Sequence, residues 1–188
     1  LYLNDKLIKD LVIPEGVQEI SSSIFRDFES IETITLPNTL ETIGSSAFDG
    51  CSSLKSILIP ESVTSIGGWA FFGCSSLRDV YINDISSWCN IDFEDSNSNP
   101  LYHANNVYLN EKIVTSVVVP EDVTRIKNYS FYNFNNMVSI ELPNTVTSIG
   151  YNAFFGCSSL ESIEIPEGVT SIGNSAFYEC SSLESIVI

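Results

Sequence analysis

Residues 54–76 read LKSILIPESVTSIGGWAFFGCSS, and this stretch decides the fold because it recurs along the chain with a period of 23 residues. Five more full copies occupy residues 8–30, 31–53, 114–136, 137–159 and 160–182. A proline holds the same place in every copy, at positions 14, 37, 60, 120, 143 and 166. Self-similarity at a period of this length is the signature of a solenoid, in which each repeat forms one coil.

Within residues 54–76 the apolar pattern predicts one coil of a β-rich solenoid. Ile57 and Ile59 occupy alternate positions, as expected of a short strand with one buried face. Pro60 ends the strand because it has no N–H to donate, and Gly67 permits a sharp turn. The A-F-x-x-C stretch predicts a helical or 3₁₀ turn that buries Phe71. Because one coil cannot bury its own apolar face, we predict a single right-handed, curved, β-dominated solenoid over residues 1–188.

A longer period lies on top of the first. Residues 1–17 (LYLNDKLIKDLVIPEGV) match residues 107–123 (VYLNEKIVTSVVVPEDV) at an offset of 106. Each segment predicts a β-hairpin with a two-residue polar turn, Asn4-Asp5 or Asn110-Glu111, although neither turn has the favoured glycine. Residues 77–113 therefore form one expanded repeat of 37 residues. We expect the chain to be a piece of a longer protein with an equivalent expanded repeat upstream of Leu1.

The composition restricts the partners. The net charge of −16 and the pI near 4.1 argue against nucleic acid, whose phosphates would repel the chain, and against an anionic membrane surface. No apolar run reaches the roughly 18 residues that span a bilayer, so direct membrane insertion is not expected. The hydrophobic share of 44% is enough for a substantial core.

The repeat resembles the BspA-like class of leucine-rich repeats. The pattern I-P-x-x-V-T-S-I-G-x-x-A-F-x-x-C reappears nearly letter for letter at Ile59–Cys74 and Ile165–Cys180. The resemblance implies an α/β-type leucine-rich-repeat fold and an extracellular or cell-surface protein with a role in adhesion or protein binding. It supplies no catalytic residues. Two copies depart from the pattern, with Ile20-Ser21-Ser22-Ser23-Ile24-Phe25 and Ile126-Lys127-Asn128-Tyr129-Ser130-Phe131 in place of I-G-x-x-A-F.

Four cysteines occupy one repeat position. They are Cys51, Cys74, Cys157 and Cys180, and the other two full copies have Phe28 and Phe134 there. A metal or disulfide ladder is one interpretation. A ligand position would not alternate with phenylalanine, however, and parallel side chains on adjacent coils suit a disulfide poorly. We therefore expect buried, reduced, structural thiols.

The sequence offers little catalytic or metal chemistry. Cys89 and the single histidine, His103, could suggest thiol catalysis, but no third residue stands at a recognisable spacing to orient them. There is no G-x-S-x-G motif. The acidic residues Asp92, Glu94 and Asp95 could bind calcium, but they lack EF-hand spacing and predict a solvated loop. We expect no enzyme, no cofactor and no metal.

Two outward-facing stripes are candidates for binding. The outward middle position of the first strand reads Val12, Thr35, Leu58, Tyr81, Val118, Glu141, Glu164 and Val187. The position after the repeat's Phe reads Arg26, Asp49, Phe72, Tyr132, Phe155 and Tyr178. Exposed apolar and aromatic side chains suit protein or glycan contact. The alternative is that they pack on the next coil and only seal the surface.

From these stripes and the expanded repeat we predict a contact surface of five residues: Leu58, Tyr81, Val118, Trp88 and Tyr102. For Trp88 and Tyr102 the competing interpretation is that they fold inward and fill a gap in the core. The predicted function is a cell-surface binding or adhesion module for a protein or glycan, with host matrix proteins among the candidates. The alternative function is a structural spacer or stalk. A contiguous exposed apolar patch around Leu58 and Tyr81 would favour binding.

Overall fold

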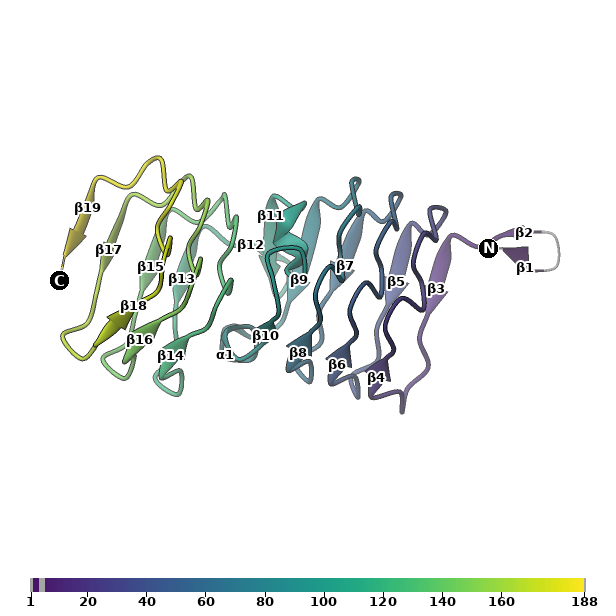
Figure 1. The fold of residues 1–188 in the computed structure, drawn as a ribbon, viewed down its shortest axis with the longest axis horizontal. Coiled ribbons are helices and arrows are strands. Elements are labelled where there is room, and N and C mark those ends of the chain that lie inside the picture. Colours follow the sequence, from purple (N-terminus) through teal and green to yellow (C-terminus); the bar gives the residue numbers. More distant parts are fainter. Residues whose placement is uncertain (1, 4–5, 188) are drawn as a thin grey trace.

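The computed structural model describes residues 2–3 and 6–187 as a stack of coils along one axis, with the two ends of the chain at opposite ends of the stack (Figure 1). Almost every coil contributes one strand to each of two parallel sheets. The long-strand sheet begins with β3 (Asp10–Val12), β5 (Thr33–Thr35), β7 (Ser56–Leu58) and β9 (Asp79–Ile82). The short-strand sheet begins with β4 (Glu19–Ile20), β6 (Thr42–Ile43), β8 (Ser65–Ile66) and β10 (Asp92–Phe93). The predicted β-dominated solenoid is confirmed.

The register shows why the repeat spacing produces this stack. Ile34 lies beside Ile57, and Ile57 beside Val80, so each inward position meets the same position of the next coil. The outward neighbours Leu58 and Tyr81 are likewise side by side. A repeat of constant length thus converts one apolar strand pattern into continuous internal rows.

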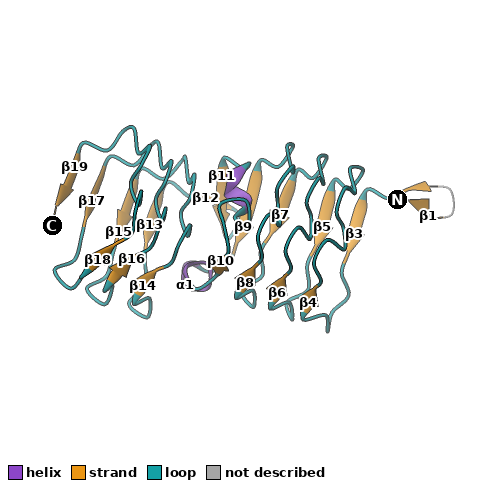
Figure 2. Cartoon of the chain, viewed as in Figure 1, coloured by secondary structure: helices purple, strands orange, loops and turns teal. Residues whose placement is uncertain are grey.

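The third side of each coil is a series of turns, which carries the aromatic core. Phe48 stacks on Phe71 with ring centroids 5.6 Å apart, and both side chains are fully buried. The tight turn expected here forms, but it does not continue as a helix, and Figure 2 shows these repeat turns as loops. Ala70 N–H donates to Gly67 O and Cys74 N–H to Phe71 O, but Trp69 has a φ of 61°. Its left-handed backbone interrupts any helical run.

The repeat glycine is required by the preceding coil. A Cβ on Gly67 would lie 2.5 Å from the backbone nitrogen of Ser45, and one on Gly150 would lie 2.6 Å from that of Asn128. In the first and fourth copies the same position holds Ser21 and Lys127. In both cases the chain directly before the copy forms a hairpin and not a regular coil. The departures from the repeat pattern therefore mark where a stack begins.

The expanded repeat separates these two stacks. The long-strand sheet of the first block (residues 8–113) ends with β11 (Asn106–Leu109) and β12 (Lys112–Ile113). The second block (residues 114–187) has its own sheets. Its long strands are β13 (Ser116–Val118), β15 (Ser139–Glu141), β17 (Ser162–Glu164) and β19 (Ser185–Val187). Its short strands are β14 (Arg125–Ile126), β16 (Ser148–Ile149) and β18 (Ser171–Ile172).

Both predicted hairpins form antiparallel pairs. β11 pairs with β12, and the turn residues Asn110 and Glu111 both have positive φ, the geometry of a type I′ turn. At the other end β1 (Tyr2–Leu3) pairs with β2 (Lys6–Leu7). The predicted Asn4-Asp5 turn of this hairpin lies outside the described residues.

The two short helices of the described chain both lie in the expanded repeat. Helix α1 (Ile85–Cys89) begins after Asp84, whose carboxylate accepts the N–H of Ser87 at 2.6 Å. The 3₁₀ helix η1 (Pro100–Tyr102) begins after Asn99, whose side chain accepts the N–H of Leu101. Helix α1 lies before β10 and η1 lies after it, and they place the buried side chains of Trp88 and Leu101 in the core.

Candidate binding surface

An exposed apolar row crosses the outer face of the long-strand sheet. Leu58 lies beside Tyr81, Tyr81 beside Tyr108, and Tyr108 beside Ile113, on four neighbouring strands. We call these four residues the strand row. Leu58 is 39% exposed and Ile113 is 51% exposed. The two tyrosine rings are half-buried and stack with centroids 4.8 Å apart and an interplanar angle of 16°. Partial burial, followed by the nearby Asp79 carboxylate, raises the pKa of Tyr81, so its hydroxyl stays neutral.

Val118 does not adjoin Tyr81, although the sequence placed the two residues together. It lies on β13, which pairs with β15 and not with β9, and its outward neighbour is Glu141. Strands β11 and β12 stand between Tyr81 and the second block. The prediction therefore missed Tyr108 and Ile113, which occupy the places next to Tyr81. The hairpin pattern of residues 107–113 was the signal that could have found them.

Trp88 is not a surface residue, so its inclusion in the contact surface was wrong. Its side chain is 2% exposed and packs against Phe93 with ring centroids 5.3 Å apart. Its indole Nε1–H donates to the carbonyl of Ser130 at 2.8 Å, which ties the expanded repeat to the second block. A buried indole needs such an acceptor. Trp88 is buried because it folds inward, as the competing interpretation proposed, and fills a gap in the core.

Tyr102 is on the surface but away from the strand row. It is 36% exposed and stacks on Tyr132 at 6.4 Å, so it extends the stripe of aromatic residues on the turn side. Along the same stripe, Tyr132 stacks on Phe155 with ring centroids 4.9 Å apart, and Phe155 stacks on Tyr178 at 5.4 Å. The faces of Phe155 are thus covered by aromatic neighbours on both sides. This arrangement favours the sealing interpretation of the turn stripe, because a stacking ligand needs free ring faces.

The repeat cysteines are free thiols with a shared structural contact. The thiols of Cys74 and Cys157 donate to the carbonyls of Phe48 and Phe131, the repeat phenylalanines of the preceding coils, at 3.2 and 3.1 Å. Cys51 and Cys180 make the same contact. Phe28 and Phe134 replace cysteine in the first coil of each block, where no regular coil supplies that carbonyl. The cysteines of the described chain form no disulfide, and all but the half-buried Cys180 are buried.

We expect one thiol to react before the others. Burial raises the pKa of Cys51 and Cys89 to about 12 and also raises the pKa of Cys74 and Cys157, so these thiols stay protonated near neutral pH. Cys180 is half-buried, and the adjoining Cys157 thiol lowers its pKa. Native protein treated with a maleimide at pH 8 should therefore label Cys180 first and the other thiols only on unfolding. Mass spectrometry of the labelled peptides measures the order. Rapid native labelling of Cys51 or Cys74 would contradict this packing.

The pairing of Cys89 with His103 gains no support. Cys89 is buried on α1, and its raised pKa, caused by burial and then by Asp84 and Asp122, is the opposite of what a nucleophile requires. No hydrogen bond joins Cys89 to His103 in the described chain. Burial, and then Arg78, lowers the pKa of His103.

The acidic residues of the expanded repeat act as hydrogen-bond acceptors for the preceding coil. The Glu94 carboxylate accepts the N–H of Gly68 at 2.6 Å, and Asp95 accepts that of Trp69 at 3.3 Å. Asp92 forms an ion pair with Lys127 at 2.8 Å. Among residues 2–3 and 6–187, no three His, Cys, Asp or Glu side chains gather closely enough to hold a metal ion.

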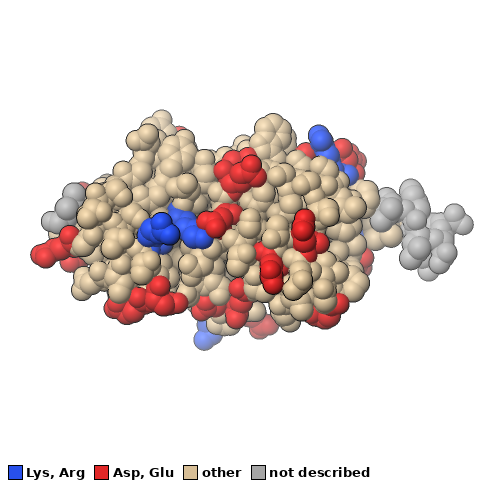
Figure 3. Space-filling view, turned by 60° about the horizontal axis from the view of Figure 1, so that its bottom comes forward, with Lys and Arg blue, Asp and Glu red and all other residues tan. Residues whose placement is uncertain are grey.

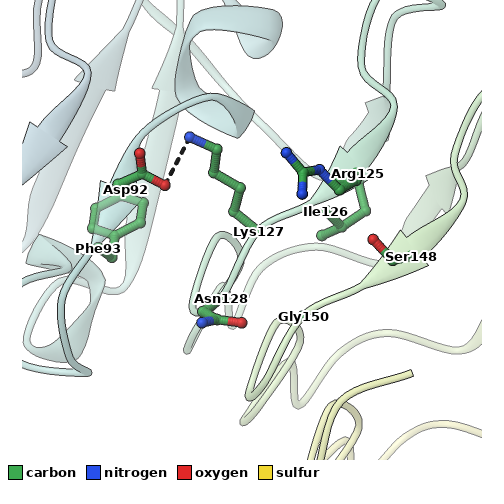
Figure 4. Close-up of a pocket in the computed structure, with 8 residues that line it drawn as sticks. All are labelled: Asp92, Phe93, Arg125, Ile126, Lys127, Asn128, Ser148 and Gly150. Atoms are coloured by element: carbon green, nitrogen blue, oxygen red, sulfur yellow. Dashed lines mark ion pairs between the residues drawn. The ribbon is translucent and has the colours of Figure 1, made fainter. Parts of the chain in front are cut away.

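A cavity of about 260 Å³ lies between the blocks, where the short-strand sheet is interrupted (Figure 4). Asp92 and Phe93 line it from β10, and Arg125 and Ile126 from β14. Lys127 reaches across to Asp92 and also donates to the carbonyl of Asn90 at 2.7 Å. Figure 3 shows adjoining basic groups in the middle of a face on which acidic groups predominate. This cavity was not predicted from the sequence.

Parallel coils of constant length, with a strand sheet along one side, define the chain as a leucine-rich-repeat solenoid. The family model described as "BspA type Leucine rich repeat region (6 copies)" matches residues 2–112 and 102–188, so the chain belongs to this family. No curated protein matches the chain. Among the described residues, no helix is long and apolar enough to cross a membrane.

Solved structures of bacterial leucine-rich-repeat proteins share the fold. A leucine-rich cell surface protein of Faecalibacterium prausnitzii A2-165 is 28% identical with a TM-score of 0.63, over 95% of this chain and 47% of that one. A leucine-rich repeat protein of T. pallidum is 25% identical with a TM-score of 0.61, over 96% of this chain and 80% of that one. A third, from Bacteroides ovatus, is 21% identical with a TM-score of 0.56 and shows the fold alone. The match covers 95% of this chain and 48% of the Bacteroides protein. The chain thus spans about half the length of the first and third of these proteins.

Proposed function

We propose that the chain is a non-enzymatic binding module of a cell-surface protein and that the strand row contacts a protein partner. The observation that carries this proposal is the contiguity of Leu58, Tyr81, Tyr108 and Ile113 on neighbouring strands. Their inward neighbours already fill the core, so folding does not require apolar groups at these outward positions. A contiguous exposed apolar patch on a soluble protein marks an interaction site.

Family and neighbours support the same proposal. Leucine-rich-repeat proteins commonly bind proteins, and leucine-rich-repeat families are generally non-enzymatic. The Faecalibacterium relative is described as a cell surface protein, which supports a surface location for this chain. A role in adhesion, with a host matrix protein as the partner, is the specific form of the proposal.

The test uses a paired variant in the strand row. Leu58→Ser with Tyr81→Ser removes apolar surface at two adjoining positions, and we expect affinity for a bound partner to fall at least about tenfold, as for truncation of interface anchors. Wild-type and variant proteins would be applied to immobilised matrix proteins and to a glycan array, and the affinities measured by surface plasmon resonance.

A matched control lies outside the strand row. Ile172→Ser with Tyr178→Ser also replaces one aliphatic residue and one tyrosine, at exposed positions of the second block. We expect this control to bind as the wild type does, with all three proteins folded by circular dichroism. Equal binding by all three would dismiss the strand row, and the spacer function predicts no specific binding by any of them. Binding to glycans alone would contradict a protein partner.

A further inference from the structure

One strand position is vacant in the short-strand sheet between the blocks. In the long-strand sheet, β9 belongs to the coil that also provides β10, and β11 is the next strand. The chain then turns back through β12 and enters β13 without contributing a short strand for the coil that β11 begins. The short strands of the described chain therefore run β8, β10, β14 and β16, with no strand between β10 and β14, where only the Lys127 side chain crosses to Asp92. The cavity lined by Asp92, Phe93, Arg125 and Ile126 lies at this place (Figure 4).

Backbone groups on the β14 side of the vacancy lack the partner that regular coils provide. In the next coil, Thr147 N–H donates to Thr124 O at 2.9 Å and Gly150 N–H to Ile126 O at 2.8 Å. In the coil of β14, Thr124 and Lys127 occupy the repeat positions of Thr147 and Gly150. Their N–H groups have no backbone acceptor in the described chain. By the repeat geometry, both point toward the empty place.

The β10 side presents the complementary groups. The carbonyls of Thr64 and Ile66 on the preceding coil accept the N–H groups of Asp92 and Glu94, at 2.8 and 3.2 Å. The corresponding carbonyls one strand further on are those of Ile91 and Phe93, and neither accepts a hydrogen bond from the described residues. Two facing strand edges with free donors and acceptors are a template for strand addition.

Charge indicates which kind of strand fits. The cavity is lined by two cations, Arg125 and Lys127, and one carboxylate, Asp92, which leaves one surplus positive charge in a chain of net charge −16. Asp92 pairs with Lys127, whereas Arg125 pairs with no carboxylate in the described chain. Asn128 accepts the N–H of Tyr151 through its carbonyl oxygen at 2.8 Å, which leaves its amide N–H groups as further donors at the cavity.

We propose that this vacancy binds a short extended segment of a partner protein that carries a carboxylate beside Arg125. The segment would displace the Lys127 side chain from Asp92 and hydrogen-bond to both strand edges. Its carboxylate would meet the Arg125 guanidinium, a geometry that arginine suits. A cavity of this size accepts a few residues of an extended chain. The site is separate from the strand row, which lies on the other sheet.

The probe is a peptide based on the strand that fills this place in a regular coil. Residues 61–68 read ESVTSIGG. Ser65 lies in register with Asp92, and Arg125 occupies the same repeat position on β14. An N-acetylated, C-amidated copy with glutamate at the position of Ser65 would be titrated into uniformly ¹⁵N-labelled protein. A matched copy has lysine there. We expect the glutamate peptide to shift the amide signals of Thr124, Arg125 and Lys127, and to bind at least about fivefold more tightly than the lysine peptide.

Two variants separate this site from the strand row. Arg125→Gln removes the exposed cation and should abolish the preference for the glutamate peptide. Leu58→Ser with Tyr81→Ser should leave peptide binding unchanged, whatever its effect on the proposed protein partner. In the free protein, the amides of Thr124 and Lys127 should exchange with deuterium faster than those of Thr147 and Gly150.

The proposal would be overturned by any of three results. They are no signal change at Thr124 and Lys127 in the low-millimolar range, equal binding of the glutamate and lysine peptides, or equal binding of a peptide with N-methylated backbone amides. Slow exchange of the Thr124 and Lys127 amides in the free protein would also overturn it, because it would show that the vacancy is already filled.

Discussion

Replacing Phe71 with alanine is expected to lower the free energy of unfolding by about 3–5 kcal/mol, the usual effect of emptying a buried aromatic site. Phe71 is fully buried and stacks on Phe48 at 5.6 Å. Its loss would leave a cavity and uncover one face of the Phe48 ring. Because each coil contacts only its neighbours, the effect should be largest in residues 31–82. Urea titration followed by circular dichroism gives the free energy, and hydrogen exchange locates the weakened coils.

Phe25→Ala is the matched control for this prediction. Phe25 is the first ring of the same ladder and stacks on Phe48 at 5.7 Å, but it is only half-buried because no regular coil precedes it. We expect a smaller loss of stability than for Phe71→Ala. A loss below about 1 kcal/mol for Phe71→Ala, or an equal loss for both variants, would contradict the coil register.

Replacing Trp88 with alanine is expected to have an effect of the same size, about 3–5 kcal/mol, but at the junction between the blocks. The two blocks share no strand pairing, so contacts outside the sheets join them. Trp88 fills the junction core and donates to Ser130 O at 2.8 Å. Its removal would leave both a cavity and an unpaired buried carbonyl. Hydrogen exchange should show the greatest loss of protection in β13 and β14.

Trp88→Phe separates packing from hydrogen bonding at the same position. It keeps an aromatic ring but removes the indole N–H, so we expect a smaller loss, about 0.5–1.5 kcal/mol for the hydrogen bond plus a modest term for the smaller ring. Urea titration of both variants gives the two values. If Trp88→Phe were as harmful as Trp88→Ala, the hydrogen bond rather than core filling would dominate. If both variants were as stable as the wild type, Trp88 would not join the blocks.

The sequence predicted the fold because the repeat encodes the packing directly. Pro60, Gly67 and Phe71 each have one position in a coil and one physical reason to be there, and repetition multiplies the signal. The two irregular copies appeared only as departures from the pattern. Their meaning required the structure, because Gly67 is dictated by contact with the preceding coil, and Ser21 and Lys127 are tolerated where that coil is missing.

The candidate surface was predicted in part. Leu58 and Tyr81 were found because an apolar outward position is unusual on a strand that already buries its other face. Val118 was placed beside them because the sequence does not show that the hairpin of β11 and β12 comes between. The orientation of Trp88 depends on a gap in the core, which no local pattern encodes. The strand vacancy depends on which coil lacks a short strand, and so it emerged only from the sheet topology.

Binding of a protein partner through the strand row can be tested by a ratio of dissociation constants. Wild type, Leu58→Ser with Tyr81→Ser, and Ile172→Ser with Tyr178→Ser would be measured against the matrix protein that binds the wild type most tightly. We predict at least about tenfold weaker binding for the strand-row variant and unchanged binding for the control. Equal dissociation constants for the three folded proteins would contradict the claim.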